Sequence, residues 1–169
     1  ERVGFRSMAL PSLRSLQQAG GALEPRLAEL YRDHMAERNG RFYMMYGQTE
    51  ATARIAVVPP DRLADKLGSA GLPIPGGRIR ISVDPSSAAP MGDHAPASGE
   101  LVYEGPNVML GYARTAADLA LGDELHGVLR TGDIGYVDDD GFVFLVGRSK
   151  RIAKVFGHRV NLDEVESMV

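Results

Sequence analysis

The 169-residue sequence contains no cysteine, which excludes disulfide bonds, thiol catalysis and thiolate metal sites. No apolar run approaches the roughly 20 residues that a membrane-spanning helix needs. The first residues do not form a basic segment followed by an apolar one, as a secretory signal would. With a net charge of −3, the chain also lacks the basic excess that is typical of nucleic-acid-binding proteins. We therefore expect a cytoplasmic protein with no membrane span and no nucleic-acid partner.

The sequence is expected to be an internal piece of a longer protein. It does not begin with methionine, and residues 161–166 have the pattern of a helix start: an N-cap candidate, early acidic residues and the beginning of an apolar period. A chain of this length holds one domain or parts of two. A piece cut in this way would expose apolar faces, and we expect dimerisation or strand exchange to cover them.

The first third of the chain has the pattern of an α/β unit. Residues 8–16 include an apolar segment that predicts a strand, and Pro25 stands where a helix would begin. From Leu27 to Met35, apolar residues recur at helical spacing. Residues 42–46 are a compact strand candidate. Strand, helix and strand in this order predict a parallel pair of strands.

After residue 60, short strand candidates are separated by glycine and proline. The candidates are residues 78–83, 99–104, 128–130, 134–137 and 142–146. Asp138 to Gly141 predicts a hairpin turn rather than a metal site. Residues 68–71 lack the Gly-Lys-Ser/Thr ending of a P-loop, so we expect a structural loop there. The fold class predicted is mixed α/β: a strand–helix–strand unit followed by a mainly antiparallel, barrel-like β unit.

Residues 46–50 place an aromatic ring, a bare backbone, a hydroxyl and a carboxylate directly after a predicted strand. Ligands of α/β sheets bind beyond the carboxyl ends of strands, so this segment is a candidate site. The ring of Tyr46 can stack on a base, and Gly47 lets a ligand approach the backbone. The hydroxyl of Thr49 can bond a phosphate oxygen, and Glu50 offers hard oxygen to Mg²⁺. Taken alone, the segment is more simply explained as a strand end, a turn and a helix cap.

Two later clusters carry further candidates. The carboxylate of Asp133 can accept hydrogen bonds from both hydroxyls of a ribose, although a turn in which aspartate bonds its own backbone is the simpler explanation. Arg148 presents planar donors for sugar or phosphate oxygens. For Arg151 and His158 in the same basic segment we prefer a solvated linker. None of the four histidines has a second histidine or a carboxylate at ligand spacing, so surface or structural roles are expected.

Together and in this order, the motifs resemble those of the adenylate-forming (AMP-binding) enzyme superfamily, the acyl- and aryl-CoA synthetases and adenylation domains. The matching stretches are residues 19–22, 46–50, 68–73, 99–112, 130–133 and 147–166. The resemblance implies an ATP-dependent carboxylic acid–thiol ligase that forms an acyl-AMP and then a thioester. The implied ligands and partners are ATP or AMP, Mg²⁺, a carboxylic acid, and the thiol of CoA or of a carrier protein's pantetheine.

The resemblance also implies roles for single residues. The implied nucleotide-binding residues are Gly20, Gly21, Ala22, Tyr46, Gly47, Thr49, Asp133 and Arg148. Among them, Tyr46 would cover one face of adenine, opposite the Gly-Gly-Ala backbone. Thr49 would bond the α-phosphate, Asp133 would bind the ribose hydroxyls, and Arg148 would add a ribose contact. Glu50 would help to hold Mg²⁺, so Thr49 and Glu50 are the implied catalytic residues.

Beyond these sites, Lys150 falls on the position of the hinge between half-reactions, while Lys154 and Gly157 match residues that act in the thioester-forming one. The implied parts are residues 1–60, the C-terminal part of the α/β adenylate-binding core; 61–147, the β-rich subdomain; and 148–169, the hinge and truncated start of the mobile C-terminal domain. Val128 departs from the family, where tryptophan is frequent. Phe156 stands where a basic residue often precedes the glycine, which leaves the CoA contacts undefined.

Two elements of the family's active site have no counterpart in this sequence: the Ser/Thr/Gly-rich phosphate loop and the lysine that stabilises the adenylation transition state. We therefore expect the chain alone to be inactive. The alternative to an acid–CoA ligase is an adenylation domain that loads a carrier protein. A minor alternative is a non-catalytic β-rich interaction module, but such a module would have no reason to keep Thr49, Glu50, Asp133 and Arg148 together. The sequence does not identify the acid.

Overall fold

The computed structural model describes residues 4–82, 98–149, 152–155 and 158–161, the last two ranges by their backbone. The helices of this part of the chain are α1 (Pro25–Ala36) and the short 3-10 helices η1 (Phe5–Ser7), η2 (Thr49–Ala51), η3 (Pro60–Arg62) and η4 (Ala116–Ala120). The strands are β1 (Ser15–Gln18), β2 (Arg41–Tyr46), β3 (Ala56–Val58), β4 (Ser69–Pro73), β5 (Arg78–Ser82), β6 (Gly99–Glu104), β7 (Val128–Val137), β8 (Val143–Arg148), β9 (Ile152–Val155) and β10 (His158–Asn161).

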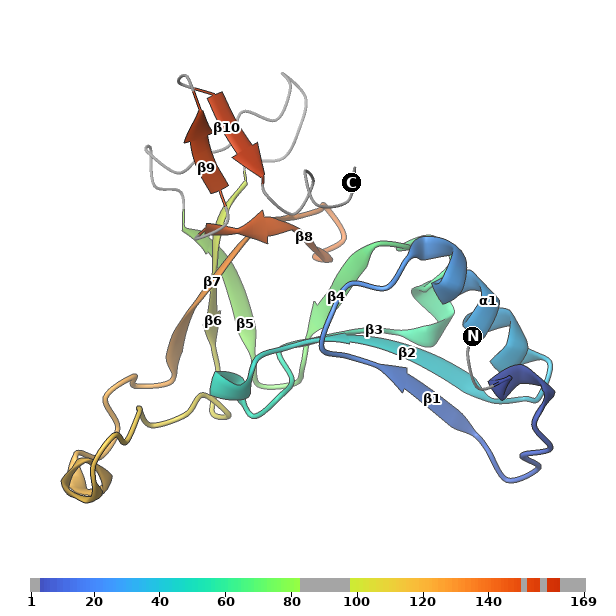
Figure 1. The fold of residues 1–169 in the computed structure, drawn as a ribbon, viewed down its shortest axis with the longest axis horizontal. Helices are drawn as coiled ribbons and strands as arrows, with labels where there is room; N and C mark the ends of the chain where they lie inside the picture. Colours follow the sequence, from blue (N-terminus) through green and yellow to red (C-terminus); the bar gives the residue numbers. More distant parts are fainter. Residues whose placement is uncertain (1–3, 83–97, 150–151, 156–157, 162–169) are drawn as a thin grey trace.

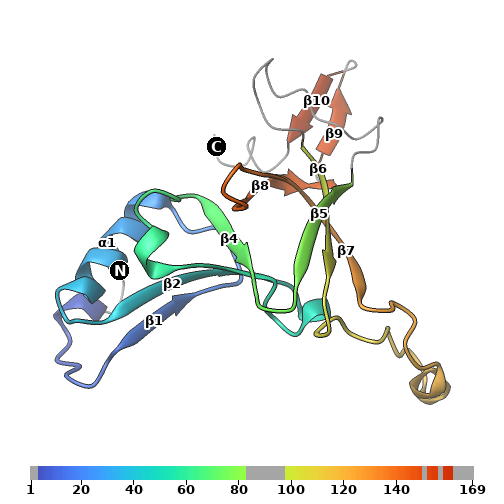
Figure 2. The ribbon, with the colours of Figure 1, turned by 180° about the vertical axis from the view of Figure 1, so that it is seen from behind.

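Strands β1 to β8 form a continuous sheet in the order β1-β2-β3-β4-β8-β7-β6-β5, while β9 and β10 pair as a separate antiparallel hairpin. Within the sheet, β1 and β2 are parallel and the other neighbouring pairs are antiparallel. Strands β1 to β3 run below α1, whereas β5 to β7 stand steeply to this first group of strands (Figure 1). Seen from behind, β4 joins the two groups (Figure 2). The predicted mixed α/β class is confirmed.

Helix α1 packs on the parallel strand pair. It begins at Pro25, where the missing N–H is no loss because the first turn has no intrahelical acceptor for it. Its residues Ala28 and Met35 join Phe42 of β2 in an apolar cluster, and each of the three is at most 3% exposed. Burying a side chain such as Met35 or Phe42 stabilises the fold by roughly 1.5–3 kcal/mol. The predicted helix and parallel strand pair are confirmed, although β1 starts later than the apolar segment at residues 8–16 indicated.

The β-rich part differs from the expected strands at two places. Residues 68–71, expected to form a loop, enter strand β4, where Gly71 has φ 99°. A side chain at Gly71 would lie 2.1 Å from the carbonyl carbon of Val57, so glycine is what allows β4 to approach β3 this closely. The two strands expected at 128–130 and 134–137 are the single strand β7. Its register against β8 shifts between Ile134 and Gly135, and this bulge breaks the apolar alternation without ending the strand.

The hairpin turn predicted at Asp138 to Gly141 is confirmed. Gly141 has φ 84° and donates a 3.0 Å backbone hydrogen bond to the carbonyl of Asp138, so the turn links β7 to β8. Lys66 lies 2.8 Å from Asp138 and 2.5 Å from Asp140, which ties the turn to the segment after η3. Across the described ranges, no group of three or more metal-binding side chains occurs.

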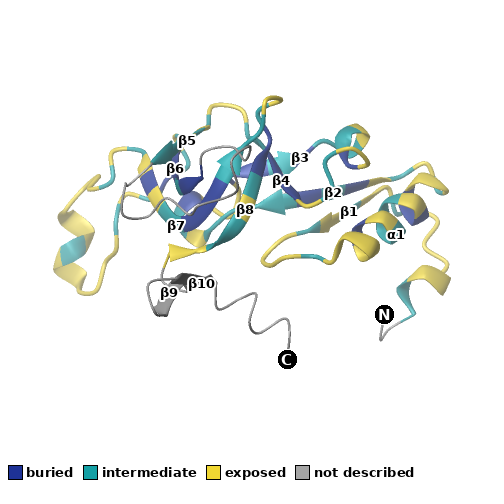
Figure 3. Cartoon of the chain, turned by 90° about the horizontal axis from the view of Figure 1, so that it is seen from above, coloured by how far each residue is buried: buried dark blue, intermediate teal, exposed yellow. Residues whose placement is uncertain are grey.

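Figure 3 shows that the buried residues lie along the sheet strands and on the inner side of α1, while the loops at both ends of the molecule are exposed. In the part of the chain that the structure describes, no helix is long and apolar enough to cross a bilayer. The helix expected from Asn161 onward falls on residues 162–169, outside the described residues, and Asn161 itself ends β10. Lys150 and Gly157 also lie outside them, and Lys154 is described only as part of the backbone of β9.

Candidate functional site

A cavity of about 520 Å³ lies where the ends of β2, β4 and β8 meet β7. Such a volume is within the range of about 300–1,000 Å³ that is typical of small-ligand sites. Its lining residues are Gln18, Gly20, Gly21, Ala22, Leu23, Met44, Met45, Tyr46, Gly47, Gly68, Ser69, Ala70, Asp133, Leu145, Gly147 and Arg148. All the predicted nucleotide-binding residues except Thr49 line this cavity, although they come from segments that are far apart in the sequence.

Asp133 is the polar centre of the cavity wall. Its side chain is only 7% exposed and projects from β7. The hydroxyl of Tyr46 donates a 2.6 Å hydrogen bond to its Oδ2, and the amide of Gln48 donates a 2.8 Å bond to the same oxygen. Arg148, its pairing partner on β8, places Nε 3.0 Å from Oδ1. A buried carboxylate requires such partners, because leaving it without hydrogen bonds would cost several kcal/mol.

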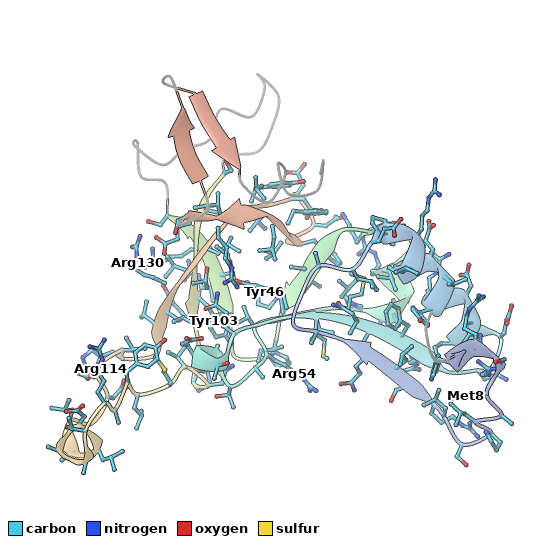
Figure 4. All side chains as sticks on the ribbon, in the orientation of Figure 1. Met8, Tyr46, Arg54, Tyr103, Arg114 and Arg130 are labelled. Carbon is cyan, nitrogen blue, oxygen red and sulfur yellow. The ribbon has the colours of Figure 1, made fainter. Side chains whose placement is uncertain are left out.

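Tyr46 is held in this contact as a neutral phenol. It is the last residue of β2 and lies where the two groups of strands meet (Figure 4). Burial and the hydrogen bond to Asp133 raise the pKa of Tyr46 well above its usual range, because removing the proton would place two negative charges side by side. The hydroxyl is therefore a donor to Asp133. The side chain packs against a buried apolar cluster that includes Tyr103 of β6 and Ala51 of η2.

Glycines give the cavity both open and closely packed walls. A side chain at Gly20 or Gly21 would meet no atom within 4 Å, so the backbone there borders free space. At Gly47 the reverse holds, because a Cβ would lie 2.4 Å from the carbonyl oxygen of Ala53. Gly47 is therefore needed so that the turn after β2 can pack on the start of the next segment. The open backbone at Gly20 and Gly21 suits a flat ligand that lies against it.

Thr49 and Glu50, the predicted catalytic pair, lie beside the cavity and not in its lining. Both belong to η2, where Thr49 is exposed. The carboxylate of Glu50 accepts a 2.5 Å hydrogen bond from the hydroxyl of Tyr112. This bond, together with a backbone hydrogen bond and the nearby charge of Arg148, lowers the pKa of Glu50. Glu50 is thus held as a carboxylate, the form that binds divalent cations.

The structure adds Gln48 and Tyr112 to the residues that sequence reasoning singled out. Gln48 lies inside the Tyr-Gly-Gln-Thr-Glu segment, but its partners Thr131 and Asp133 are 83 and 85 positions away. Tyr112 is 62 positions from Glu50. Sequence proximity therefore gave no sign of either contact. Among the histidines, His34 is buried with its ring edge against Phe5, which agrees with a structural role.

The chain matches known proteins over most of its length. The family model described as AMP-binding enzyme matches residues 3–113. A probable 4-coumarate–CoA ligase 1 of Dictyostelium discoideum is 35% identical over 162 residues, 95% of this chain and 28% of that protein. A 2-succinylbenzoate–CoA ligase of Bacillus velezensis is 37% identical over 158 residues, 92% of this chain and 30% of that protein.

Solved structures give the same result. O-succinylbenzoate coenzyme A synthetase of Bacillus subtilis, in complex with ATP and magnesium ion, has a TM-score of 0.69 at 31% identity, over 94% of this chain and 31% of that one. An amide bond synthetase of Marinactinospora thermotolerans has a TM-score of 0.72 at 31% identity, over 98% and 32%. The chain spans about a third of the length of these relatives. With the family model covering well over half of its residues, the chain belongs to the AMP-binding enzyme family.

Proposed function

We propose that this chain forms one wall of the nucleotide site of an ATP-dependent carboxylic acid–CoA ligase. The observation that carries the proposal is the convergence of Tyr46 and Arg148 on the buried carboxylate of Asp133. The cavity there is also lined by the open backbone of Gly20 and Gly21. A carboxylate in a cavity can accept hydroxyl donors of a ribose. The CoA ligases among the relatives support the same reading.

The proposed reaction has two steps. A carboxylate oxygen of the substrate attacks the α-phosphorus of ATP and forms an acyl-AMP. The bond between this phosphorus and the bridging oxygen breaks, and pyrophosphate leaves with the electron pair. The thiol, having lost its proton to solvent, then attacks the acyl carbon as a thiolate. The bond from this carbon to the phosphate oxygen breaks, a thioester forms and AMP leaves. The task of the protein is to position the reactants and to stabilise charge at phosphorus. In this chain Asp133 would hold the ribose, the backbone at Gly20 and Gly21 and the ring of Tyr46 would hold the base, and Thr49 would reach the α-phosphate.

A magnesium ion fits the residues that the chain offers. Mg²⁺ usually keeps several waters and binds one or two carboxylates together with substrate phosphates. The described residues provide no cage of three or more ligands, but Glu50 provides one carboxylate with a lowered pKa. Glu50 would therefore hold the ion together with the phosphates and not in a site made of protein alone. When bound, Mg²⁺ would neutralise the developing charge on the phosphoryl oxygens.

The first experiment measures AMP binding by calorimetry in the full-length protein and its Asp133→Ala variant. Hydrogen bonds to a charged acceptor are worth about 1.5–3 kcal/mol each, so the variant is expected to bind AMP at least about tenfold more weakly. If the unmodified protein binds no AMP, the proposal fails, and a non-catalytic role for the β-rich part becomes the better explanation.

A second experiment identifies the acceptor of the acyl group. The full-length protein is expected to release AMP with a carboxylic acid and free CoA, and release only with a carrier protein would favour the adenylation-domain alternative. An amine acceptor belongs in the same assay, because an amide bond synthetase is among the similar structures.

The 169-residue chain is expected to show no ATP–pyrophosphate exchange. Exchange by the chain alone would contradict the expected inactivity.

A further inference from the structure

Gln48 connects the end of β2 to β7 through its side-chain amide. The amide nitrogen donates a 2.8 Å hydrogen bond to the carbonyl oxygen of Thr131 and a 2.8 Å bond to Oδ2 of Asp133. The backbone of Gln48 is itself fixed, because its carbonyl accepts 3.0 Å hydrogen bonds from the backbone N–H groups of Ala51 and Ala53. The side chain therefore extends from a rigid base toward the carboxylate.

The orientation of this amide follows from its partners. Both contacts of the nitrogen are oxygen acceptors, a carbonyl and a carboxylate, so the NH₂ group and not the oxygen of Gln48 must face them. Thr131, which supplies the carbonyl, is fixed by a 2.8 Å hydrogen bond from its hydroxyl to the carbonyl of Leu101. An amide does not titrate, so Gln48 presents the same donor to Asp133 whatever the pH.

The hydrogen bonds divide the two oxygens of Asp133 unequally. A carboxylate has roughly two acceptor sites on each oxygen. On Oδ2 these sites are taken by Tyr46 and Gln48. On Oδ1 the partner is Arg148, whose side chain is 66% exposed, so solvent or a ligand can replace it most easily. Oδ1 is therefore the oxygen with accepting capacity left for a ligand.

We infer that Gln48 is a positioning residue for nucleotide recognition: it holds Oδ2 of Asp133 on the protein side and thereby presents Oδ1 to the ribose hydroxyls. This inference rests on the proposed function, because it takes the ligand to be an adenine nucleotide. Gln48 need not touch the nucleotide to act in this way. Without the amide of Gln48, the carboxylate of Asp133 could rotate. The position of Oδ1 relative to the ribose would then no longer be fixed.

The competing explanation is that Gln48 only braces β2 against β7. A brace stabilises the whole site, so its loss would lower the affinity for every nucleotide by a similar factor. A positioning residue affects only the ribose contact, so its loss would lower the preference for a nucleotide with ribose hydroxyls over one without them. This difference between the two ligands separates the explanations.

The experiment measures, by calorimetry in the full-length protein, the affinities of AMP and of dideoxy-AMP, which lacks both ribose hydroxyls. The unmodified protein is expected to prefer AMP by at least about tenfold, since hydrogen bonds to a charged acceptor contribute this much or more. Gln48→Met has nearly the same length but no donor. It is expected to reduce the preference by about fivefold to tenfold and to leave the affinity for dideoxy-AMP almost unchanged.

Two further variants complete the test. Gln17→Met makes the same chemical change on β1, where the side chain is exposed and accepts a hydrogen bond from Arg54, and it is expected to keep the full preference. Gln48→Asn retains an amide on a shorter arm, is a milder change if Gln48→Met folds poorly, and is expected to reduce the preference to a smaller extent.

Equal weakening of AMP and dideoxy-AMP by both Gln48 variants would overturn the inference and make Gln48 a brace. A different result would count against the proposed function itself. If the unmodified protein binds AMP and dideoxy-AMP equally well, Asp133 does not bind the ribose hydroxyls. In that case the ribose assignment of the proposed function fails, and the inference falls with it.

Discussion

The hydroxyl of Tyr46 lies 2.6 Å from Oδ2 of Asp133, although 87 positions separate the two residues in the sequence. One comes from the end of β2 in the α/β part, and the other from β7 in the β-rich part. The contact therefore joins the two parts at the cavity. Its acceptor is a buried charge, so it should stabilise the fold more than a hydrogen bond between neutral groups does.

Replacing Tyr46 by phenylalanine tests this. The ring remains, and Asp133 keeps Gln48 and Arg148 but loses one donor. We expect Tyr46→Phe to lower the free energy of unfolding by about 1.5–3 kcal/mol, measured by urea denaturation. Tyr103→Phe is the matched control, since its buried hydroxyl donates a 2.7 Å bond to the neutral amide oxygen of Asn107 and should cost only about 0.5–1.5 kcal/mol. Equal losses would show that the charge of Asp133 adds nothing.

The same contact predicts a loss of stability in alkali. An unfolded tyrosine ionises near pH 10, whereas the raised pKa keeps Tyr46 protonated in the folded protein. Its contribution is thus fully present below about pH 10 and is lost as the pH rises further, because ionisation then favours the unfolded state. Between pH 9 and pH 11, the urea midpoint of Tyr46→Phe should fall less than that of the unmodified protein. An identical fall in both proteins would contradict the assignment.

Regular elements with a clear pattern could be predicted from the sequence. The apolar spacing of α1 and the compact run of β2 sufficed, because both bury one side against the same cluster. Strand β4 could not be predicted, since its glycine and proline content is typical of a loop, and its strand state depends on the fit of Gly71 against Val57. Strand β7 was divided in two because its bulge interrupts the alternation of apolar residues.

The site was predictable where a residue's chemistry is visible on its own, and not where it depends on a partner. Tyr46, Asp133 and Arg148 could be named from motif order, and the structure brings them into contact. Gln48 could not, since an amide has no evident role until its acceptors are known, and those acceptors lie on β7. The contact of Tyr112 could not be predicted for the same reason, because its partner Glu50 lies on η2, 62 positions away.

The contact between Tyr112 and Glu50 predicts a change in the pKa of Glu50. The phenol hydrogen bond is the main cause of the lowered pKa, so Tyr112→Phe should raise it toward its usual value. The pKa can be followed by an NMR titration of the carboxyl carbon of Glu50. Asp65 is an internal control, because its lowered pKa is due chiefly to Arg62 and should stay unchanged. An unaltered titration of Glu50 would mean that the hydroxyl is not bound in solution.

The cations beside the β7–β8 turn predict a loss of stability in acid. Lys66 lowers the pKa of Asp140, and it also lowers that of Asp138, where partial burial acts in the opposite direction. Lowered pKa values contribute stability above the unfolded value of about 4, and this contribution is lost as the pH falls below it. In Lys66→Met the urea midpoint should therefore fall less between pH 6 and pH 3 than in the unmodified protein. A fall of the same size in both would exclude Lys66 as the cause.

The approach of β4 to β3 gives the last prediction. Gly71 and Gly68 both have positive φ, 99° and 80°, so alanine at either position would add backbone strain of about 1–2 kcal/mol. Only at Gly71 would the new methyl group also collide with backbone, 2.1 Å from Val57, whereas at Gly68 no atom lies within 4 Å. Backbone cannot move aside as a flexible side chain can, and overpacking adds about 1–3 kcal/mol more.

Gly71→Ala should therefore lower the free energy of unfolding by about 2–5 kcal/mol, against about 1–2 kcal/mol for Gly68→Ala. Urea denaturation of both variants measures the difference. Because β4 joins the two groups of strands, the Gly71 variant should also disturb the cavity that Ala70 lines and weaken AMP binding. Equal destabilisation by the two variants would mean that β4 does not approach Val57 closely in solution.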